Sequence, residues 1–330
     1  MSERAATVRS FAKINLDLRV LNKRPDNYHE LRTVFQTISL ADTIRIRLAR
    51  SHRTRLAIEG NVEIPDNLIL RAAEAVLGAA RINADIKFSL DKKIPMGAGL
   101  GGGSSNAAAV LLALPVLAGV HIPLPRLVAL GTGLGSDVPF FLYGGTALGI
   151  GRGTELYPLP DVPARYGVLV APGVHVSTPE AYRDLNRGPA AEALTSAGAG
   201  ADTDDFQSLA WLLADARASE NWKTLCANDF EPAVFRQHPE LGTWKRRLGK
   251  LGASPTLMTG SGSALFGLFS SQEEAEDAHR HCSTRTPAKA SVYLITLFTR
   301  SRYRGTWRRD LAEHIQPDLQ WPPRSRYSTQ

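Results

Sequence analysis

Apolar residues along this chain recur with the two spacings that distinguish strands from helices. Between residues 8 and 20, apolar side chains from Ile14 to Val20 alternate with polar ones, which predicts a half-buried strand. Residues 105–117 are instead rich in alanine and leucine, which favours a helix. The same patterns predict further strands at 31–40, 44–48, 55–58, 86–90, 145–150, 168–171 and 291–298, and two short ones within 256–269.

Predicted helices lie between and after these strands, and the two kinds of element are mixed rather than strictly alternating. That order indicates an α+β fold. Residues 186–205, which are rich in alanine, glycine, threonine and aspartate, are predicted to form a long mobile loop. The predicted helices cover 67–80, 105–117, 123–131, 178–185, 206–216, 230–237, 241–251 and 272–281.

The composition is that of a globular protein with a sizeable core. The chain has 330 residues, of which 43% are hydrophobic and 22% charged, and this length suits two domains or one large one. No N-terminal signal core and no apolar run of about 18 residues occurs, so we expect no membrane span. The two cysteines, Cys226 and Cys282, lack metal-binding spacing, which favours the reducing cytoplasm.

Positive charge is concentrated at the C-terminal end. The formal net charge is +7, and residues 300–330 hold seven arginines against three acidic residues. Trp307 and Trp321 favour a segment that docks on the rest of the protein, whereas the charge fits a disordered basic tail equally well. In either case, deletion of this segment is expected to leave catalysis intact.

The most distinctive stretch is 95–107, because five of the seven residues from Gly97 to Gly103 are glycine. Glycine tolerates positive φ and lets the backbone approach a ligand closely. A predicted strand precedes the stretch and a helix follows it, with Ser104 or Ser105 placed to cap that helix. Backbone N–H groups and the positive end of the helix dipole would then hold an anion, for which the phosphate chain of a nucleotide is the best candidate.

Two common nucleotide-binding motifs do not describe this loop. Residues 97–102 satisfy G-x-G-x-x-G, but the strand and helix begin about 85 residues into the chain and no acidic residue follows at the required distance of about 20. A P-loop requires Lys-Ser or Lys-Thr directly after its glycines, and neither pair follows the glycines here. A flexible linker is the remaining alternative, and the capped apolar helix behind the loop disfavours it.

The full pattern of residues 95–108, P-x-x-x-G-L-G-G-G-S-S-N-A-A, resembles the phosphate loop of the GHMP kinases. This resemblance implies two domains. An N-terminal domain like ribosomal protein S5 domain 2 would cover 1–165, and a ferredoxin-like C-terminal domain would cover 166–299, with a basic tail at 300–330. It also implies an ATP site made of Pro95, Met96, Gly97, Ala98, Gly99, Leu100, Gly101, Gly102, Gly103, Ser104 and Ser105, with Asn67 near the adenosine.

Phosphoryl transfer needs a group that orients the attacking hydroxyl and a cation that balances charge. Asp137, within L-G-S-D-V-P, fits either a general base or a turn and helix cap on the residues alone. Lys13, within A-K-I-N, would more commonly be a solvated strand lysine. Both segments match GHMP motifs, and the resemblance implies that Asp137 is the catalytic base and that Lys13 orients it and offsets developing negative charge.

Further matches to the family imply an acceptor site. The resemblance places Asn15 in hydrogen-bonding contact with the acceptor and assigns Thr178, Tyr28, His29 and Tyr182 to substrate binding. The exact sequence of the glycine loop resembles that of one branch of the family, whose members phosphorylate the 2-hydroxyl of a cytidine-diphosphate methylerythritol. We therefore expect the cytosine to lie between the two tyrosines, with the histidine at its edge.

The resemblance also implies ATP and Mg²⁺ as cofactors and a small molecule as the substrate. The magnesium ligands stay open, with the hydroxyl of Ser104 or Ser105 as candidates. Two other functions compete: a different GHMP kinase, of the homoserine or mevalonate type, and an RNA-binding protein on an S5-like fold. The glycine loop has no interleaved aromatic residues, which disfavours nucleic acid. We expect a monomer or a homodimer.

Overall fold

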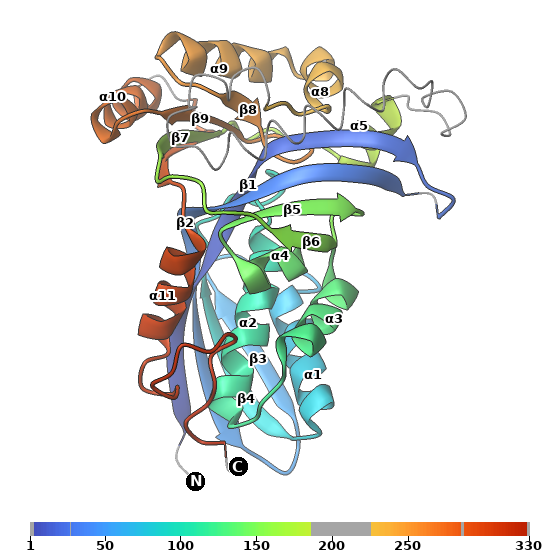
Figure 1. The fold of residues 1–330 in the computed structure, drawn as a ribbon, viewed down its shortest axis with the longest axis vertical. Coiled ribbons are helices and arrows are strands. Elements are labelled where there is room, and N and C mark those ends of the chain that lie inside the picture. The colour runs from blue at the N-terminus through green and yellow to red at the C-terminus, as the bar shows by residue number, and fades with distance from the viewer. Residues whose placement is uncertain (1–2, 27, 186–225, 285–286, 329–330) are drawn as a thin grey trace.

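Two β-sheets and the long hairpin that joins them organise the protein. The computed structural model describes residues 3–26, 28–185, 226–284 and 287–328 (Figure 1). The predicted loop 186–205 and the predicted helix 206–216 lie outside the described residues. The first sheet consists of β1 (Arg4–Lys23), β2 (His29–Arg50), β3 (Arg55–Gly60), β4 (Ala84–Asp91), β5 (Thr146–Gly151) and β6 (Glu155–Pro158).

The first sheet has the order β3-β4-β2-β5-β6, and β1 pairs with β2. Only β3 and β4 run parallel among these pairs. One face of the sheet packs against helices, and alternate strand residues such as Ile44 and Ile46 are fully buried beneath them. These helices are α1 (Leu68–Ala80), α2 (Gly102–Ala118), α3 (Leu124–Leu134) and α4 (Val138–Tyr143).

The second sheet has the order β10-β7-β9-β8, with every neighbouring pair antiparallel. This is the strand order of the ferredoxin-like arrangement, so the expected α+β fold with that second domain is confirmed. In the described part of the chain, no helix is long and apolar enough to cross a membrane. The strands are β7 (Tyr166–Ala171), β8 (Thr256–Met258), β9 (Leu265–Phe269) and β10 (Ser291–Thr296), and the helices are α5 (Thr178–Asp184), α8 (Glu231–Gln237), α9 (Pro239–Lys250) and α10 (Gln272–Ser283).

From Ser10 to Leu18, strand β1 is buried on both faces where the sequence predicts one exposed face. Lys13, Asn15 and Asp17 are only 4%, 3% and 1% exposed. The hairpin of β1 and β2 extends beyond the first sheet and lies beneath the second domain (Figure 1). Thr259 and Gly260 bond to Asn15, and Ala227 donates to Asp17, whereas Lys13 lies against Asp137. Alternation in one strand shows its two faces but not whether a distant segment covers the polar one.

Two predicted boundaries are wrong. Residues 31–40 and 44–48 belong to the single strand β2, because the backbone at Asp42 continues the ladder opposite Ser10. Helix α2 begins at Gly102, and neither Ser104 nor Ser105 caps it. Its N-cap is Gly101, a left-handed residue with φ 67° and no side-chain cap, and the Ser105 hydroxyl instead donates to the Phe11 carbonyl at 2.6 Å.

The C-terminal segment docks on the first domain. It forms helix α11 (Arg300–Asp310), and Thr299 caps that helix by accepting from the N–H of Arg302. Tyr303 and Trp307 lie one turn apart on the same face and are 2% and 1% exposed within the core of the first domain. Of the two alternatives for this segment, docking on the body is the one that the structure shows for residues 300–328.

A buried ion pair holds the chain where it enters the glycine loop. Asp42 is fully buried, and its carboxylate accepts from the Lys92 ammonium and from the backbone N–H groups of Lys93 and Ile94, each at 2.7 Å. These three residues directly precede Pro95, the start of the glycine loop. The path of that loop therefore depends on a carboxylate from the middle of β2.

We predict that Asp42→Asn destabilises the protein by about 3–5 kcal/mol, because it leaves the buried Lys92 charge unpaired. The matched control is Asp91→Asn, which removes the exposed partner of Lys93 and should cost about 0–1 kcal/mol. Denaturant unfolding of both variants and the wild type measures the difference. Equal stability of the two variants would show that the Asp42 pair does not anchor this segment.

Candidate active site

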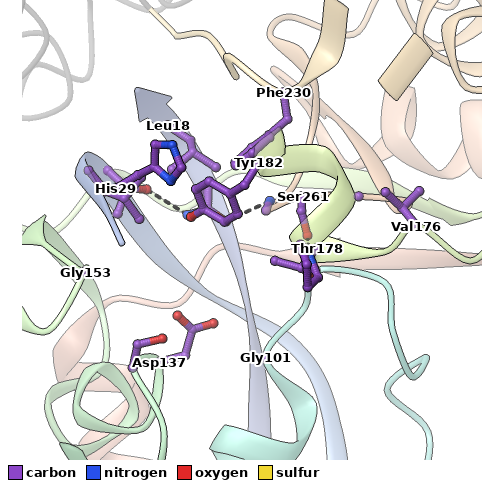
Figure 2. A pocket seen from close by; sticks show the side chains of 18 of the residues that line it. Leu18, His29, Gly101, Asp137, Gly153, Val176, Thr178, Tyr182, Phe230 and Ser261 are labelled. Atoms are coloured by element: carbon purple, nitrogen blue, oxygen red, sulfur yellow. Dashed lines mark hydrogen bonds between the residues drawn. The ribbon is translucent and has the colours of Figure 1, made fainter. Parts of the chain in front are cut away.

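A cleft of about 1240 Å³ lies where the glycine loop, the β1–β2 hairpin and the second domain meet. Asp137 and Gly101 lie at one end of it, and His29 and Tyr182 lie at the other (Figure 2). The cleft therefore has a polar, glycine-lined end and an aromatic end. Residues of both predicted sites, for the nucleotide and for the acceptor, line the same continuous space.

The glycine loop presents alternate residues to the cleft. Gly97, Gly99 and Gly101 have φ of 65°, 75° and 67°, and they line the cleft together with Ser104. Left-handed backbone at every second position turns the intervening residues away from the cleft, so Ala98 and Leu100 are buried in the core. The other predicted ATP-site residues, Pro95, Met96, Gly102, Gly103, Ser105 and Asn67, are not among the residues that line the cleft.

Helix α2 directs its N-terminus at this loop. It is 17 residues long, and no side chain caps its first N–H groups. Those donors and the positive end of the helix dipole are therefore available to an anion. Asn67 is used differently: its side chain caps α1 by accepting from the N–H of Ile69 at 3.0 Å, which places the start of α1 beside Gly103.

Lys13 and Asp137 form an ion pair at the polar end. The Lys13 ammonium lies 3.5 Å from the Asp137 carboxylate, and the side chains are 4% and 31% exposed. Asp137 occupies the N-cap position of α4, yet its side chain makes no capping hydrogen bond. The carboxylate instead faces the cleft, so the cap alternative is not the one that the geometry supports. The backbone N–H of Lys13 also donates to the Leu100 carbonyl at 3.1 Å, which ties β1 to the glycine loop.

The Asn15 side chain is used inside the protein. Its carbonyl oxygen accepts from the Lys13 ammonium at 2.8 Å, from the Thr259 hydroxyl at 3.2 Å and from the N–H of Gly260 at 3.0 Å. Its amide nitrogen donates to the Thr33 hydroxyl at 2.7 Å. The carbonyl is therefore occupied within the protein, where Asn15 positions Lys13 and joins it to the glycine turn at 259–262. The amide has a second N–H and Asn15 lines the cleft, so the expected hydrogen bond from Asn15 to the acceptor stays a prediction.

The aromatic end combines His29, Tyr182 and Phe230. The rings of His29 and Tyr182 stack at 4.9 Å, and Phe230 meets Tyr182 edge-on at 4.8 Å. Burial raises the pKa of Tyr182 to about 12, and the negative charge of Asp137 adds to this shift. Burial, assisted by Lys23, lowers the pKa of His29 below its usual 6.5. Both rings are therefore neutral at neutral pH.

Tyr28 lies at the mouth of the aromatic end. Its ring is 52% exposed, and the Arg152 guanidinium lies over it at 3.4 Å from the centroid. The ring that faces Tyr182 in this structure is His29 and not Tyr28. A base could enter between the two tyrosines only if the imidazole moved off Tyr182 and turned its edge toward the base.

The Thr178 hydroxyl, a predicted acceptor-site group, bonds to the Ser261 hydroxyl at 2.8 Å and so joins α5 to the glycine turn at 259–262. Two further cleft residues, His175 and Arg152, were not singled out from the sequence. His175 lies against Gly97, and Arg152 stands between two glycines of positive φ. Among residues 3–26, 28–185, 226–284 and 287–328, no group of three or more His, Cys, Asp or Glu side chains is placed to bind a metal.

Comparison with known proteins identifies the class that this fold and cleft represent. The model of the GHMP kinase N-terminal domain matches residues 67–145, which include the glycine loop and Asp137, and the model of the GHMP kinase C-terminal domain matches residues 206–287. The chain belongs to the GHMP kinase family. It is 53% identical over 328 residues, 98% of either chain, to 4-diphosphocytidyl-2-C-methyl-D-erythritol kinase of Solibacter usitatus.

Other relatives and solved structures agree with this assignment. The enzyme of the same name from Geobacter sulfurreducens is 39% identical over 88% of this chain and 99% of its own. A crystal structure of 4-(cytidine 5'-diphospho)-2C-methyl-D-erythritol kinase superposes with a TM-score of 0.69 at 36% identity, over 90% of this chain and 99% of that one. Homoserine kinase from Cytophaga hutchinsonii also gives a TM-score of 0.69, but at 22% identity over 88% of this chain and 94% of that one it shows the fold alone.

We predict that Gly101→Ala weakens ATP binding at least tenfold. An added Cβ would lie 2.9 Å from the Phe141 ring and 3.3 Å from Lys13, at a φ that alanine disfavours. The matched control is Gly78→Ala, in α1, where a Cβ meets nothing within 4 Å. Calorimetric titration with ATP measures both affinities. Unchanged ATP affinity in Gly101→Ala would remove the loop from the phosphate site.

Proposed function

We propose that the protein transfers the γ-phosphoryl group of ATP to the 2-hydroxyl of 4-(cytidine 5'-diphospho)-2-C-methyl-D-erythritol, in isoprenoid precursor biosynthesis. The observation that carries the proposal is the cleft itself. One end joins an uncapped helix N-terminus and a glycine loop to the Lys13–Asp137 pair, and the other end is aromatic. The named activity of the 53% identical relative supports the same assignment.

In the proposed mechanism, the glycine loop and α2 hold the nucleotide phosphates. Asp137, which faces the cleft, accepts the proton of the attacking hydroxyl. Lys13 holds the carboxylate in place and offsets charge that develops on the transferred group. The Asn15 carbonyl accepts from the Lys13 ammonium and is itself held by Thr259 and Gly260. The positive charge is therefore in position before substrate binds.

Magnesium fits this site as a companion of the nucleotide rather than as a resident ion. Mg²⁺ keeps several waters and is bound by substrate phosphates with one or two protein oxygens, so it needs no cluster of acidic residues. Ser104 and Asp137 both line the cleft, and their side-chain oxygens could serve as these protein ligands. The ion would neutralise phosphate charge during transfer.

The aromatic end favours a cytidine acceptor over the acceptors of other family members. Homoserine and mevalonate are small and carry no base, so they would leave Tyr28, His29 and Tyr182 without a partner. A neutral imidazole has one donor and one acceptor, which suits the edge of a cytosine. Free thiols at Cys226 and Cys282 are consistent with the reducing cytoplasm as the site of action.

We predict that the wild type releases ADP only when the cytidylyl acceptor is present, and that Asp137→Asn lowers kcat by about 10²–10⁴-fold. Loss of the base removes proton transfer but not the phosphate site, so ATP affinity should stay within a few-fold. The control is Asp277→Asn on α10, which removes an exposed aspartate outside the cleft. Turnover of the Asp137 variant within a few-fold of the control would make Asp137 structural. Release of ADP with homoserine instead would overturn the acceptor.

We predict that Tyr28→Ala raises the acceptor KM by about 5–100-fold and leaves the ATP KM unchanged. Stacking of a base on an aromatic ring contributes about 1–3 kcal/mol, and its loss from both ground and transition states changes KM rather than kcat. The matched control is Tyr157→Ala, an equally exposed tyrosine outside the cleft. Tyr182→Ala should act in the same direction. Steady-state kinetics, with cytidine diphosphate as a competitor, test this, and failure of cytidine diphosphate to compete would contradict the cytosine site.

A further inference from the structure

The C-terminal segment lies directly against the helix that begins at Asp137. The Tyr303 hydroxyl donates to the carbonyl of Phe141, and the Trp321 indole N–H donates to the carbonyl of Leu142 at 2.8 Å. These carbonyls belong to the last turn of α4, where no further helical residue can pair with them. Two side chains from the segment 299–328 therefore complete the C-terminus of this six-residue helix.

The chain after α4 is shaped to receive this segment. Gly144 and Gly145 have φ of 66° and 74°. A Cβ on Gly144 would overlap the Tyr303 ring, and one on Gly145 would lie 2.7 Å from the Cβ of Arg300. Arg300 also donates to the Thr146 carbonyl at 2.5 Å. The glycine pair thus gives the segment room to pack on the backbone itself.

Helix α4 connects this contact to the cleft. Asp137 stands at its N-terminal end, and Phe141 lies one turn later. A Cβ built on Gly101 would lie 2.9 Å from the Phe141 ring and 3.3 Å from the Lys13 side chain, so Phe141 packs directly on the glycine loop beside Lys13. A shift of α4 would therefore move the aspartate and loosen the packing of the glycine loop together.

We infer that Tyr303 is a positioning residue: its hydrogen bond to Phe141 holds α4, and through α4 it sets the placement of Asp137 relative to Lys13 and the glycine loop. Trp321 supports it at the next carbonyl. This inference rests on the proposed role of Asp137. It replaces the expectation that the C-terminal segment can be removed without loss of catalysis.

The test compares Tyr303→Phe with Ser325→Ala. Each removes one buried hydroxyl that donates from the segment to a helix carbonyl, but Ser325 donates to Val116 at the far end of α2, at 2.6 Å. Both variants should lower Tm by a similar few degrees. Only Tyr303→Phe should lower kcat, about tenfold, with the acceptor KM within twofold of wild type, because small displacements of a reacting group cost rate rather than binding.

Assays are run well below both Tm values, so that every variant is folded. Equal kcat for the two variants would overturn the inference and leave the segment with a stabilising role alone. If Tyr303→Phe does not fold, Trp321→Phe removes the indole donor to Leu142 while it keeps an aromatic ring at that position, and it should lower kcat about threefold. An unchanged kcat in Trp321→Phe would then overturn the inference. A wild type that shows no acceptor-dependent release of ADP would instead contradict the proposed function.

Discussion

The glycine loop can occupy its position only because two backbones touch there without side chains between them. A Cβ on Gly99 would overlap the carbonyl of Thr259, and one on Gly260 would lie 3.1 Å from the Cα of Gly99. The loop is also tied to β1 through Lys13 and Leu100, and to the second domain through the N–H of Ala264 and the carbonyl of Ala98, at 3.1 Å and 3.3 Å. Both domains therefore determine the shape of the proposed nucleotide site, and the cleft forms where the two domains meet.

The buried Lys13 follows from the same constraint. Removal of an ammonium from water is costly unless partners surround it, and its two partners here differ in kind. Asn15 is neutral and is held by the second domain, whereas Asp137 is charged and faces the cleft. The protein fixes the lysine with a neutral group, so in the proposed mechanism the carboxylate keeps its freedom to accept a proton.

Periodicity and one motif were enough to predict much of this architecture. The alternation from Ile14 to Val20, the helix behind the glycines and the two short strands within 256–269 all lie where the sequence indicated. Local sequence could not reveal partners distant in the chain. Asp42 has no neighbouring signal for the buried pair it makes with Lys92, some 50 residues away. The hydrogen bonds that the Asn15 carbonyl accepts likewise depend on residues 259–260.

For α11, by contrast, a signal was present. Tyr303, Trp307 and Leu311 recur every four residues, which is the spacing of a buried helical face, but the surrounding arginines conceal the pattern. The stacking of His29 on Tyr182 could not be predicted, because it depends on how the β1–β2 hairpin lies relative to α5.

The two ends of the chain meet in the same core, and this affects how the protein is made. Arg4 donates to the Leu117 carbonyl and stacks on Tyr327, while His314 bonds to the carbonyl of Ala5. During synthesis β1 emerges almost 300 residues before α11, the helix that packs against it (Figure 1). Domains usually fold as units while the ribosome is still elongating the chain. Here the core of the first domain stays open until α11 has left the ribosome, so it closes only after the second domain has been synthesised.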